Sequence, residues 1–430
     1  MNSAVNKKTA IVIGTGAGGA QVARNLQGKY QVTILEAGGA FKPFSLSVNK
    51  MAKFRKTGLY LDERMIRQLI PNMMVEKSQD MVMVRGIGLG GTTTLATGNA
   101  VRYDGKLKAL GIDLDAQFEA LYAELPITTD HQKHWTRTTR QMYSLFERMG
   151  LDPVVTPKFL DANRCTGCGH CAIGCKYGAK WDTRQLVDAA VANGAELVTG
   201  CKVTDLEIRG GEVTAVHARY GGRKQTFHAD LVILAAGGFG SPVILENSGI
   251  ICEKTLFVDP VLCVAGPLPG LHQERQILMP FISQQDGYIL APYMDYLSFF
   301  FNKDWRLPMK DMASIMIKLA DEEVGAVSDK KIDKQMTEAD HKKMVQAAAL
   351  TRRILVRMGI PEEKQFLGTL NAGHPGGMLP LSAAEKDSLH PAVLPDNLYV
   401  ADATLLPGSM GNPPILTIMA LAKKIASVLS

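Results

Sequence analysis

The sequence predicts an α/β fold in which a Rossmann-type nucleotide-binding domain is interleaved with a smaller α+β domain built on an antiparallel sheet. Three observations carry this prediction. Residues 9–36 read as a βαβ unit with a glycine-rich turn. Apolar, strand-like runs return at 231–238 and 397–403. Residues 255–310 are apolar and aromatic with period-two patterning, which indicates a second sheet. The length of 430 residues also favours two domains over one core.

The opening βαβ unit predicts a dinucleotide site. The strand at 9–13 leads into GTGAGG, which opens a helix, and the second strand ends at Glu36. The glycines of this turn are Gly14, Gly16, Gly18 and Gly19. They permit a tight turn and let the backbone approach a pyrophosphate at a helix N-terminus, where free N–H groups favour anions. Glu36 is placed to accept hydrogen bonds from an adenosine ribose. The alternative is a glycine-rich turn that holds no ligand.

Three later segments favour FAD over NAD as the dinucleotide. The segment GIGLGGTTTLATGN at 86–99 offers a second backbone-rich loop, and LVILAAGGFGSP at 231–242 offers a third. Asp402 ends a late strand, where flavoproteins position the pyrophosphate and ribitol. A Rossmann NAD enzyme would not need three such dispersed contributions. The predicted contacts from these and neighbouring segments are Gly90, Gly91, Thr92, Val203, Ala236, Gly237, Asp402 and Pro413.

The rest of the chain alternates helices and strands. Residues 42–76 are basic and methionine-rich without a clear strand pattern, and 106–150 are mostly helical. A long helix is expected over 337–358, with Thr337 as N-cap, and a final helix from Pro414 onward. The predicted division is a discontinuous FAD-binding domain (1–105, 185–255 and 385–430), a helical segment with a cysteine loop (106–184) and a substrate domain (256–384).

Four cysteines with the spacing C-x2-C-x2-C-x3-C form the most specific motif of the chain. They are Cys165, Cys168, Cys171 and Cys175. Bacterial ferredoxins use this spacing to bind an iron–sulfur cluster, and soft thiolates suit such clusters. The sequence therefore predicts a [4Fe–4S] cluster, with [3Fe–4S] as a variant. Zinc is an alternative, although structural zinc usually takes two separated C-x2-C pairs. A cysteine-rich loop held by packing or a disulfide is the other alternative.

The last cluster ligand stays open between several residues. In two-cluster ferredoxins the fourth cysteine of the run serves the other cluster, so a single cluster here could take three ligands from the run. Cys201 is the nearest candidate outside it. His170, inside the run, is either a ligand or a solvated loop residue. Cys252 and Cys263 are expected to be core residues.

These segments, in this order, resemble the glucose–methanol–choline (GMC) oxidoreductase family. The resemblance rests on GTGAGG with Glu36, GLGGTTT, LVILAAGGFGSPVILENSGI, AGHPGG and the terminal NLYVADATLLPGSMGNPPILTIMALAKKIA. It implies a GMC-like FAD-binding fold. The cysteine region CGHCAIGCKYGAK is similar to the long-chain alcohol oxidase branch, and some sugar dehydrogenases of the family carry a cluster in this region with different spacing. Ala96 stands where the family often has an Asn, and the chain is shorter than most members.

The resemblance implies that His374 and Asn412 flank the reactive face of the flavin. Oxidising an alcohol requires removal of the hydroxyl proton while hydride leaves the carbon. A neutral imidazole is a suitable base near pH 7, and an amide can donate to and accept from the same oxygen. The alternatives are a loop histidine beside a Pro-Gly-Gly turn and an asparagine that caps the last helix.

Composition limits location and partners. The net charge is +6 without a concentrated basic tract, which does not favour nucleic acid. No signal peptide and no apolar run long enough for a spanning helix are visible, so a cytoplasmic location with reduced thiols is expected. The basic residues Lys50, Lys53, Arg55 and Lys56 form a solvated surface or dock an acidic electron carrier. The aromatic residues that line an apolar substrate pocket or fill the sheet core are Tyr288, Tyr293, Tyr296, Phe299, Phe300 and Phe301.

Together these features predict an FAD-dependent dehydrogenase of a hydrophobic alcohol. His374 is the predicted base, Asn412 binds the substrate oxygen, and an iron–sulfur cluster passes electrons to an external protein or quinone. One alternative is a ferredoxin-fed reductase of a carbonyl or activated alkene. A second is a cluster-free alcohol oxidase, and a third is an electron-transfer partner without a small-molecule substrate.

Overall fold

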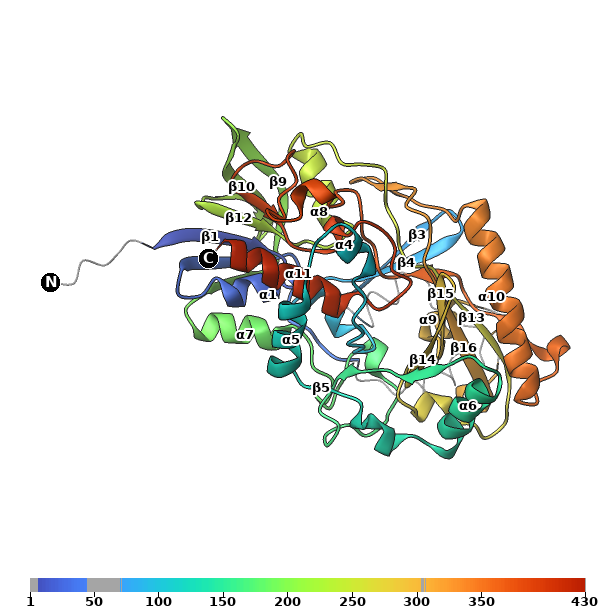
Figure 1. Cartoon of the computed structure of the whole chain (residues 1–430). Coiled ribbons are helices and arrows are strands. Elements are labelled where there is room, and N and C mark those ends of the chain that lie inside the picture. Colours follow the sequence, from blue (N-terminus) through green and yellow to red (C-terminus); the bar gives the residue numbers. More distant parts are fainter. Residues whose placement is uncertain (1–6, 45–69, 71, 303–304, 306, 430) are drawn as a thin grey trace.

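A computed structural model describes residues 7–44, 70, 72–302, 305 and 307–429 and divides them mainly between two large sheets (Figure 1). A parallel sheet lies near the first and last helices, and a larger, mainly antiparallel sheet lies on the opposite side of the molecule. This mixed architecture confirms the predicted α/β fold class. The predicted basic surface at Lys50, Lys53, Arg55 and Lys56 lies outside the described residues.

Five parallel strands form the first sheet. In sheet order they are β21 (Leu398–Val400), β12 (Leu231–Leu234), β1 (Lys8–Ile13), β2 (Tyr30–Glu36) and β8 (Glu196–Thr199). Ile13 pairs with both Leu35 and Leu234, so the three central strands end at one level. Helix α1 (Ala17–Asn25) contacts β1 and β12 as well as α7 (Arg184–Ala192) and α11 (Ile415–Val428). This arrangement confirms the βαβ opening and brings the two ends of the described chain together.

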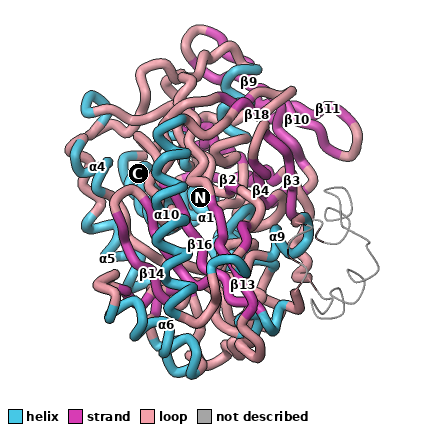
Figure 2. The backbone as a smooth tube through the Cα atoms, turned by 90° about the vertical axis from the view of Figure 1, so that its right-hand side faces the viewer, coloured by secondary structure: helices cyan, strands magenta, loops and turns pink. Residues whose placement is uncertain are grey.

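A second sheet contains nine strands and is antiparallel except where β20 pairs with β4. Its order is β3 (Met73–Ser78), β4 (Met81–Gly86), β20 (Asn371–Ala372), β13 (Val261–Pro267), β16 (Met312–Leu319), β15 (Tyr288–Pro292), β14 (Phe281–Gln285) and β6 (Pro153–Val155), with β19 (Phe366–Leu367) beside β13. Helix α10 (Glu338–Arg357) lies across one face and contacts β13 and β16 (Figure 2). Every residue of β16 is buried, as expected for a central strand covered on both sides.

The remaining elements surround these sheets. They are α4 (Gly105–Ala109), α5 (Asp115–Glu124), α6 (Arg137–Arg148), α8 (Gly240–Asn247), α9 (Tyr296–Phe301), the three-stranded sheet of β9 (Cys201–Arg209), β10 (Glu212–Tyr220) and β11 (Arg223–Phe227), and the pairs β5 (Ile127–Thr128) with β7 (Lys158–Phe159) and β17 (Ala326–Val327) with β18 (Ile332–Asp333). None of the described helices is long and apolar enough to cross a membrane.

One prediction about local structure is wrong in part, and one is confirmed in detail. The strand pattern of 255–310 holds for β13, β14 and β15, but Tyr296–Phe301 forms helix α9. The reason is Asp295, whose carboxylate accepts hydrogen bonds from the N–H groups of Leu297 and Ser298 and so caps a helix. The segment 42–76, which shows no clear strand pattern, lies mostly outside the described residues; near its end β3 begins at Met73 and pairs with β4. Thr337 caps α10 as predicted, in a capping box with Asp340.

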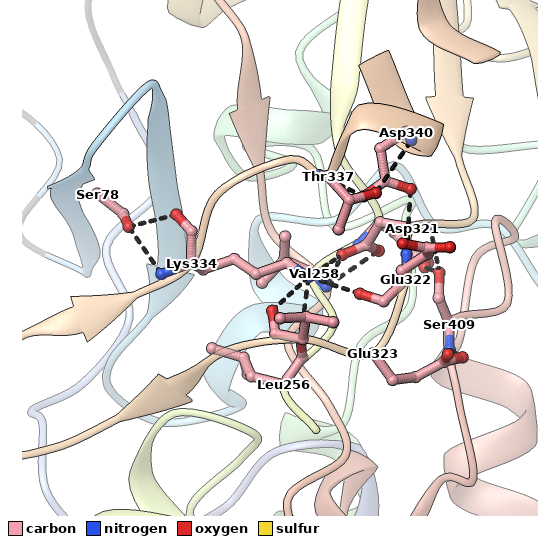
Figure 3. Close-up of polar contacts among 12 residues, drawn as sticks. Ser78, Leu256, Val258, Asp321, Glu322, Glu323, Lys334, Thr337, Asp340 and Ser409 are labelled. Atoms are coloured by element: carbon pink, nitrogen blue, oxygen red, sulfur yellow. Dashed lines mark hydrogen bonds and ion pairs between the residues drawn. The ribbon is translucent and has the colours of Figure 1, made fainter. Parts of the chain in front are cut away.

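A buried ion pair connects the second sheet to the loops beside it (Figure 3). The Nζ atom of Lys334 lies 2.8 Å from a carboxylate oxygen of Asp321, and both side chains are fully buried. Lys334 also donates to the carbonyls of Leu256, Glu322 and Val324. The Asp321 carboxylate accepts from the N–H groups of Val258 and Asp259, and its own N–H donates to Ser409 Oγ at 3.0 Å. This network fixes Asp259 and Ser409, which lie at the candidate active site.

Candidate active site and cysteine cavity

The first glycine-rich loop is packed against the ends of two neighbouring strands. A Cβ atom on Gly14, whose φ is +101°, would lie 2.3 Å from the carbonyl oxygen of Ala235. A Cβ on Gly18 would lie 1.5 Å from the carbonyl oxygen of Ala401. Only glycine fits at these two positions. A Cβ on Gly16 would meet nothing within 4 Å, so the loop is open at this point alone among the three.

The N-terminus of α1 fits a pyrophosphate. Gly16 is its N-cap, no side chain caps the helix, and its first turn holds no acidic residue. The free N–H groups and the helix dipole therefore face an open position at Gly16 and attract an anion. Gly19 packs against the loop, since its Cβ would lie 2.1 Å from the carbonyl oxygen of Gly14.

Glu36 holds the first two glycine-rich loops together. One carboxylate oxygen accepts from the N–H and hydroxyl of Thr15 at 3.1 and 2.6 Å, and the other accepts from the N–H groups of Gly38 and Gly88 at 2.9 and 3.1 Å. Burial raises the pKa of this carboxyl, and the four hydrogen bonds oppose the shift. A cavity of about 590 Å³ opens next to Glu36, lined by Ala37, Gly38, Gly39, Ala40, Lys42, Asn72, Met73, Met74 and Ile87. Its position fits an adenosine at the end of β2.

The second glycine-rich loop lies directly over the first. Gly90 donates from its N–H to Thr15 Oγ1 at 3.0 Å. A Cβ on Gly91 would lie 3.0 Å from the Cα of Gly16. Thr92 opens the short 3₁₀ turn with Gly91, and its hydroxyl accepts from the N–H of Gly86 at 3.1 Å. The structure thus brings two predicted cofactor loops onto the same sheet edge.

Asp402 joins the third loop to the end of the last strand. Its carboxylate accepts from the N–H of Gly237 at 2.8 Å, from the hydroxyl of Ser241 at 2.5 Å and from the N–H of Thr404 at 2.8 Å. Burial raises the pKa of this carboxyl. Ala236 lies beside it, with its N–H donating to Ser241 Oγ. Two further predicted contacts lie on other elements: Val203 is buried in β9, which contacts β2, and buried Pro413 precedes α11.

His374 lies in a loop that packs on this third segment. The loop follows β20, and a Cβ on Gly238 would lie 2.1 Å from the carbonyl oxygen of Pro375. The imidazole is partly exposed, but its Nδ1 atom is buried and has no hydrogen-bond partner among the described residues. Burial, together with the charge of Lys318, lowers the pKa of His374 to about 3, while Asp259 opposes the shift. The ring is therefore neutral at physiological pH.

Asn412 is buried and held from both ends. Its amide donates to Gln284 Oε1 at 2.9 Å and to the carbonyl of Met410 at 3.3 Å, and its backbone carbonyl accepts from Lys318 Nζ at 2.7 Å. No hydrogen bond between Asn412 and His374 is found within the described ranges. Lys318 connects the two residues: it donates a hydrogen bond to the Asn412 carbonyl, and its charge lowers the pKa of His374.

Lys318 and Asp259 are site residues that sequence reasoning missed. Lys318 forms a buried ion pair with Asp259, which also accepts from the hydroxyl of Ser409 and the N–H of Gly411. A signal was present, because Lys318 is the one charged residue in the apolar run MASIMIKL of β16. A charge in the middle of a buried strand is retained only with a partner.

The four cysteines of the spaced run line one small cavity. Cys165, Cys168, Cys171 and Cys175 surround it together with His170 and Lys180, and all four thiols are free. Among the described residues no three His, Cys, Asp or Glu side chains are close enough together to hold a metal ion as they stand. Burial raises the pKa of Cys171 to about 11, opposed by Lys158 and Lys180. The run therefore converges on one space without forming a closed ligand set.

Two buried lysines adjoin this cavity without carboxylate partners. Lys158 Nζ lies 2.5 Å from Asn99 Oδ1, and Lys180 Nζ donates to the carbonyls of Thr93, Thr94, Ala96 and Cys171 at 2.7–3.2 Å. Neither forms an ion pair in the part of the chain that the structure describes. Burial lowers the pKa of Lys158 to about 8, and the nearby Cys171 and Cys165 thiols oppose the shift. Two ammonium groups thus share a buried region whose acceptors are neutral.

The other residues near the run have structural contacts. Tyr296 donates from its hydroxyl to the carbonyl of Gly169 at 2.8 Å, and the ring of His170 lies 6.4 Å from that of Tyr296. Tyr296, Phe299 and Phe300 are buried in a core cluster with Trp305, which favours core packing over a substrate pocket. Cys201, Cys252 and Cys263 are buried elsewhere, as expected for the last two.

The convergence of three dispersed glycine-rich loops on one sheet edge is the cofactor architecture of FAD-dependent oxidoreductases, and residues 176–424 match the family model named FAD dependent oxidoreductase. Residues 8–261 match the model of the GMC oxidoreductases. The chain belongs to the GMC oxidoreductase family. This finding confirms the resemblance predicted from the sequence, and FAD is its cofactor.

Individual relatives agree with this family. An uncharacterized protein of Methanocaldococcus jannaschii is 28% identical over 96% of this chain and 97% of its own. The long-chain-alcohol oxidase FAO1 of Arabidopsis thaliana is 24% identical and matches 65% of this chain and 48% of its own length. Among solved structures, pyridoxine 4-oxidase from Mesorbium loti has a TM-score of 0.73 at 15% identity and covers 98% of this chain and 99% of its own. That structural likeness shows the fold.

A matched pair of glycine variants separates folding from cofactor binding. Gly18→Ala places a methyl group against the Ala401 carbonyl, so we expect the free energy of unfolding to fall by several kcal/mol, or the protein not to fold. Gly16→Ala meets no protein atom, so we expect an unfolding midpoint close to wild type but weaker retention of FAD. Thermal unfolding and the flavin-to-protein absorbance ratio measure both. Equal flavin retention in Gly16→Ala and wild type would contradict the pyrophosphate assignment.

Proposed function

We propose that this chain is an FAD-dependent dehydrogenase that oxidises a hydrophobic alcohol to a carbonyl and delivers the electrons singly, through an iron–sulfur cluster in the cysteine cavity, to an external protein or quinone. The observation that carries the proposal is the cavity itself. It is lined by four free thiols and by Lys180, whose ammonium is bonded to the second cofactor loop. Lys158 lies outside the lining but interacts electrostatically with Cys171 and Cys165, and neither lysine has a carboxylate partner among the described residues.

The alcohol chemistry is assigned to His374 and Asn412. A neutral imidazole can accept the hydroxyl proton, and burial beside Lys318 keeps it neutral. Asn412 would bind the substrate oxygen once its amide exchanges Gln284 for the ligand. Bound FAD supplies the two-electron acceptor for the hydride that leaves the carbon. The hydrophobic character of the substrate is supported by the long-chain-alcohol oxidases among the relatives.

The donor set of the cavity fits an iron–sulfur cluster. Four thiolates and a cluster core carry net negative charge, and burying that charge requires cations nearby. Lys158 and Lys180 supply two, and the absence of a carboxylate partner in the described ranges leaves their charge available. Burying an ammonium group without a counter-ion costs folding free energy. Two such groups beside four thiols therefore favour an anion in the cavity. Cys175 lines the cavity and Cys201 does not, which favours Cys175 as the last ligand.

Closing the ligand set requires a rearrangement of the cysteine loop. Gly167, Gly169 and Gly174 stand between the cysteines with φ values of +65°, +73° and +92°. These left-handed residues give the loop turns that other residues disfavour and let the thiols turn inward. A cluster supplies one-electron chemistry. Lys180 joins the loop to the cofactor side, since its ammonium bonds both Cys171 and the carbonyls of 93–96.

A lysine variant tests whether the cavity holds an anion. Lys158→Met removes a buried positive charge and replaces lysine with an uncharged side chain of similar length. We expect the iron-to-flavin ratio to fall in this variant, while the iron-free protein becomes more stable because an uncompensated charge is gone. Metal analysis and thermal unfolding before and after chelation measure the two effects. Lys176→Met, at an exposed lysine of the same loop, is the matched control and should change neither. An unchanged iron ratio in Lys158→Met would contradict the charge argument.

A cluster-free alcohol oxidase is the second candidate function. It is favoured by the long-chain-alcohol oxidase relatives and by the absence, among the described residues, of a closed metal-ligand group. In that case the thiols would be held by packing or a disulfide. The two functions differ in the electron acceptor. After anaerobic reduction by dodecan-1-ol, a dehydrogenase reduces one-electron acceptors faster than oxygen, whereas an oxidase consumes oxygen and produces hydrogen peroxide. A ferredoxin-fed reductase would run the same chemistry in reverse.

A further inference from the structure

We infer that the rim of the cysteine cavity is the docking surface for an acidic one-electron carrier protein, an inference that rests on the proposed relay. Exposed basic residues lie around the cavity mouth. The docking rim, as we define it, comprises Lys133, Arg164, Lys176, Tyr177 and Arg275, all of them exposed. Thr166 and Tyr177, which line the cavity, are exposed as well, so the cavity opens on this surface.

Contacts within the rim show that its cations form one surface. Arg164 donates to the carbonyl of Tyr177 at 3.1 Å, and Lys176 Nζ lies 5.0 Å from the centre of the Tyr177 ring. Lys133 Nζ lies 2.6 Å from Asn163 Oδ1, next to Arg164 in sequence. The carbonyl oxygen of Arg275 lies 4.0 Å from the position of a Cβ on Gly167, in the cysteine loop. The cysteine loop therefore carries two of these cations, and Lys133 is hydrogen-bonded beside it. The backbone of Arg275 packs against the same loop, while its guanidinium lies 3.7 Å from Glu274.

Two carboxylates of the same segments are engaged within the protein, whereas Asp130, in the short helix of Lys133, is exposed. Asp161 accepts from the N–H groups of Asn163 and Arg164, and Glu274 is buried beside His272. Lys133, Arg164 and Lys176 form no ion pair within the described part of the chain, so their charge faces solvent. A patch of one sign attracts a partner of opposite sign and raises the rate of encounter. Tyr177, exposed by 44% at the centre of the rim, offers the aromatic anchor common in interfaces.

The docking rim surrounds the place where the cysteine cavity reaches the protein surface. Electron carriers exchange electrons over short distances, so they dock where a centre lies closest to solvent. The cavity mouth is such a place on the described surface, because the thiols line a space that reaches exposed Thr166 and Tyr177. The same surface would serve whether electrons leave the enzyme or enter it, since docking is set by charge and not by direction. The chemistry of the rim therefore selects an acidic carrier.

The test uses anaerobically purified holoenzyme and an acidic [2Fe–2S] ferredoxin as probe. Iron and flavin are counted on every preparation. Calorimetry measures ferredoxin binding at low and high salt, and stopped-flow absorbance measures flavin bleaching by dithionite-reduced ferredoxin. The rim variant is Arg164→Glu with Lys176→Glu. The matched control is Arg223→Glu with Lys224→Glu, the same charge change on the exposed β10–β11 hairpin.

We expect the rim variant to lose about tenfold or more in affinity and bleaching rate at low salt, and high salt to weaken wild type similarly. The hairpin control should stay within about twofold of wild type, and flavin content should be equal in all three. An equal loss of affinity in the rim and hairpin variants, or ferredoxin binding that does not depend on salt concentration, would contradict the docking surface. If the protein holds no iron and yet binds ferredoxin through the rim, the docking surface stands and the relay fails. If iron is present and the rim variant binds normally, the relay stands and the docking surface fails.

Discussion

Replacing His374 with alanine should slow substrate-driven reduction of the flavin by a factor of about 10²–10⁴, the range that a positioned base contributes. The substitution removes the partly exposed imidazole whose Nδ1 has no hydrogen-bond partner among the described residues. Flavin content should remain at the wild-type level, because none of the described contacts of the glycine-rich loops uses this side chain. Anaerobic stopped-flow reduction with dodecan-1-ol measures the effect. Flavin reduction at the wild-type rate in His374→Ala would remove the catalytic assignment.

The pH dependence follows from the same environment. Burial and Lys318 lower the pKa of His374 to about 3, so the base is neutral and competent from about pH 4 upward. We therefore expect kcat/KM to show no acid limb near 6.5, where an ordinary histidine would lose activity by protonation. Lys318→Met removes the repelling charge, so the pKa of His374 should rise and an acid limb should move toward neutral pH. His374→Gln separates the proton transfer from simple positioning, since glutamine keeps a polar group but cannot act as the base.

Replacing Cys171 with serine should remove the cluster and leave the flavin. Cys171 lines the cavity, and its carbonyl is bonded by Lys180 through a backbone contact that serine preserves. We expect iron and sulfide to fall several-fold, flavin to stay near one per chain, and reduction of one-electron acceptors to be lost. Alcohol-driven reduction of the flavin itself should persist, because His374 and the glycine-rich loops are unaltered.

The control for this variant is Cys252→Ser, at a buried cysteine that does not line the cavity. It should keep iron at the wild-type ratio. Electron paramagnetic resonance of the dithionite-reduced proteins distinguishes a cluster from adventitious iron. Cys171→Ser with an unchanged spectrum and an unchanged iron count would show that this cysteine is not a ligand. Cys175→Ser and Cys201→Ser then decide which thiolate is the last one.

The elements that local rules govern could be predicted from the sequence. The βαβ opening, the capped helix at Thr337 and the final helix follow from apolar periodicity, glycine position and capping chemistry, which act over a few residues. Helix α9 could not be predicted from periodicity, because it is short, all its residues but Ser298 are apolar or aromatic, and Asp295 alone indicates its start. Strand β3 forms only because β4 lies beside it. Pairing of this kind depends on tertiary contacts.

The candidate site shows the same division. The glycines, Glu36, Asp402 and the cysteine spacing carry a pattern that spacing alone makes visible. Lys158 carries none, and the patterns at Lys180 and Lys318 do not show their partners, because the importance of all three arises from burial beside groups distant in the chain. Lys318 approaches Asn412 across 94 residues, and Lys180 approaches Thr93 across 87. A single charge in an apolar strand is the sole local sign of such residues, and it marks Lys318 better than the other two.

The central claim is that the cysteine cavity holds an iron–sulfur cluster in electronic contact with a flavin. The most direct measurement is a count of iron, sulfide and FAD on protein purified without oxygen, with an absorbance spectrum of the same sample. The proposal predicts about four irons and four sulfides per FAD, or about three irons for an incomplete cluster, and broad visible absorption beside the flavin bands. A flavin-only spectrum without bound iron would contradict it and establish a cluster-free oxidoreductase.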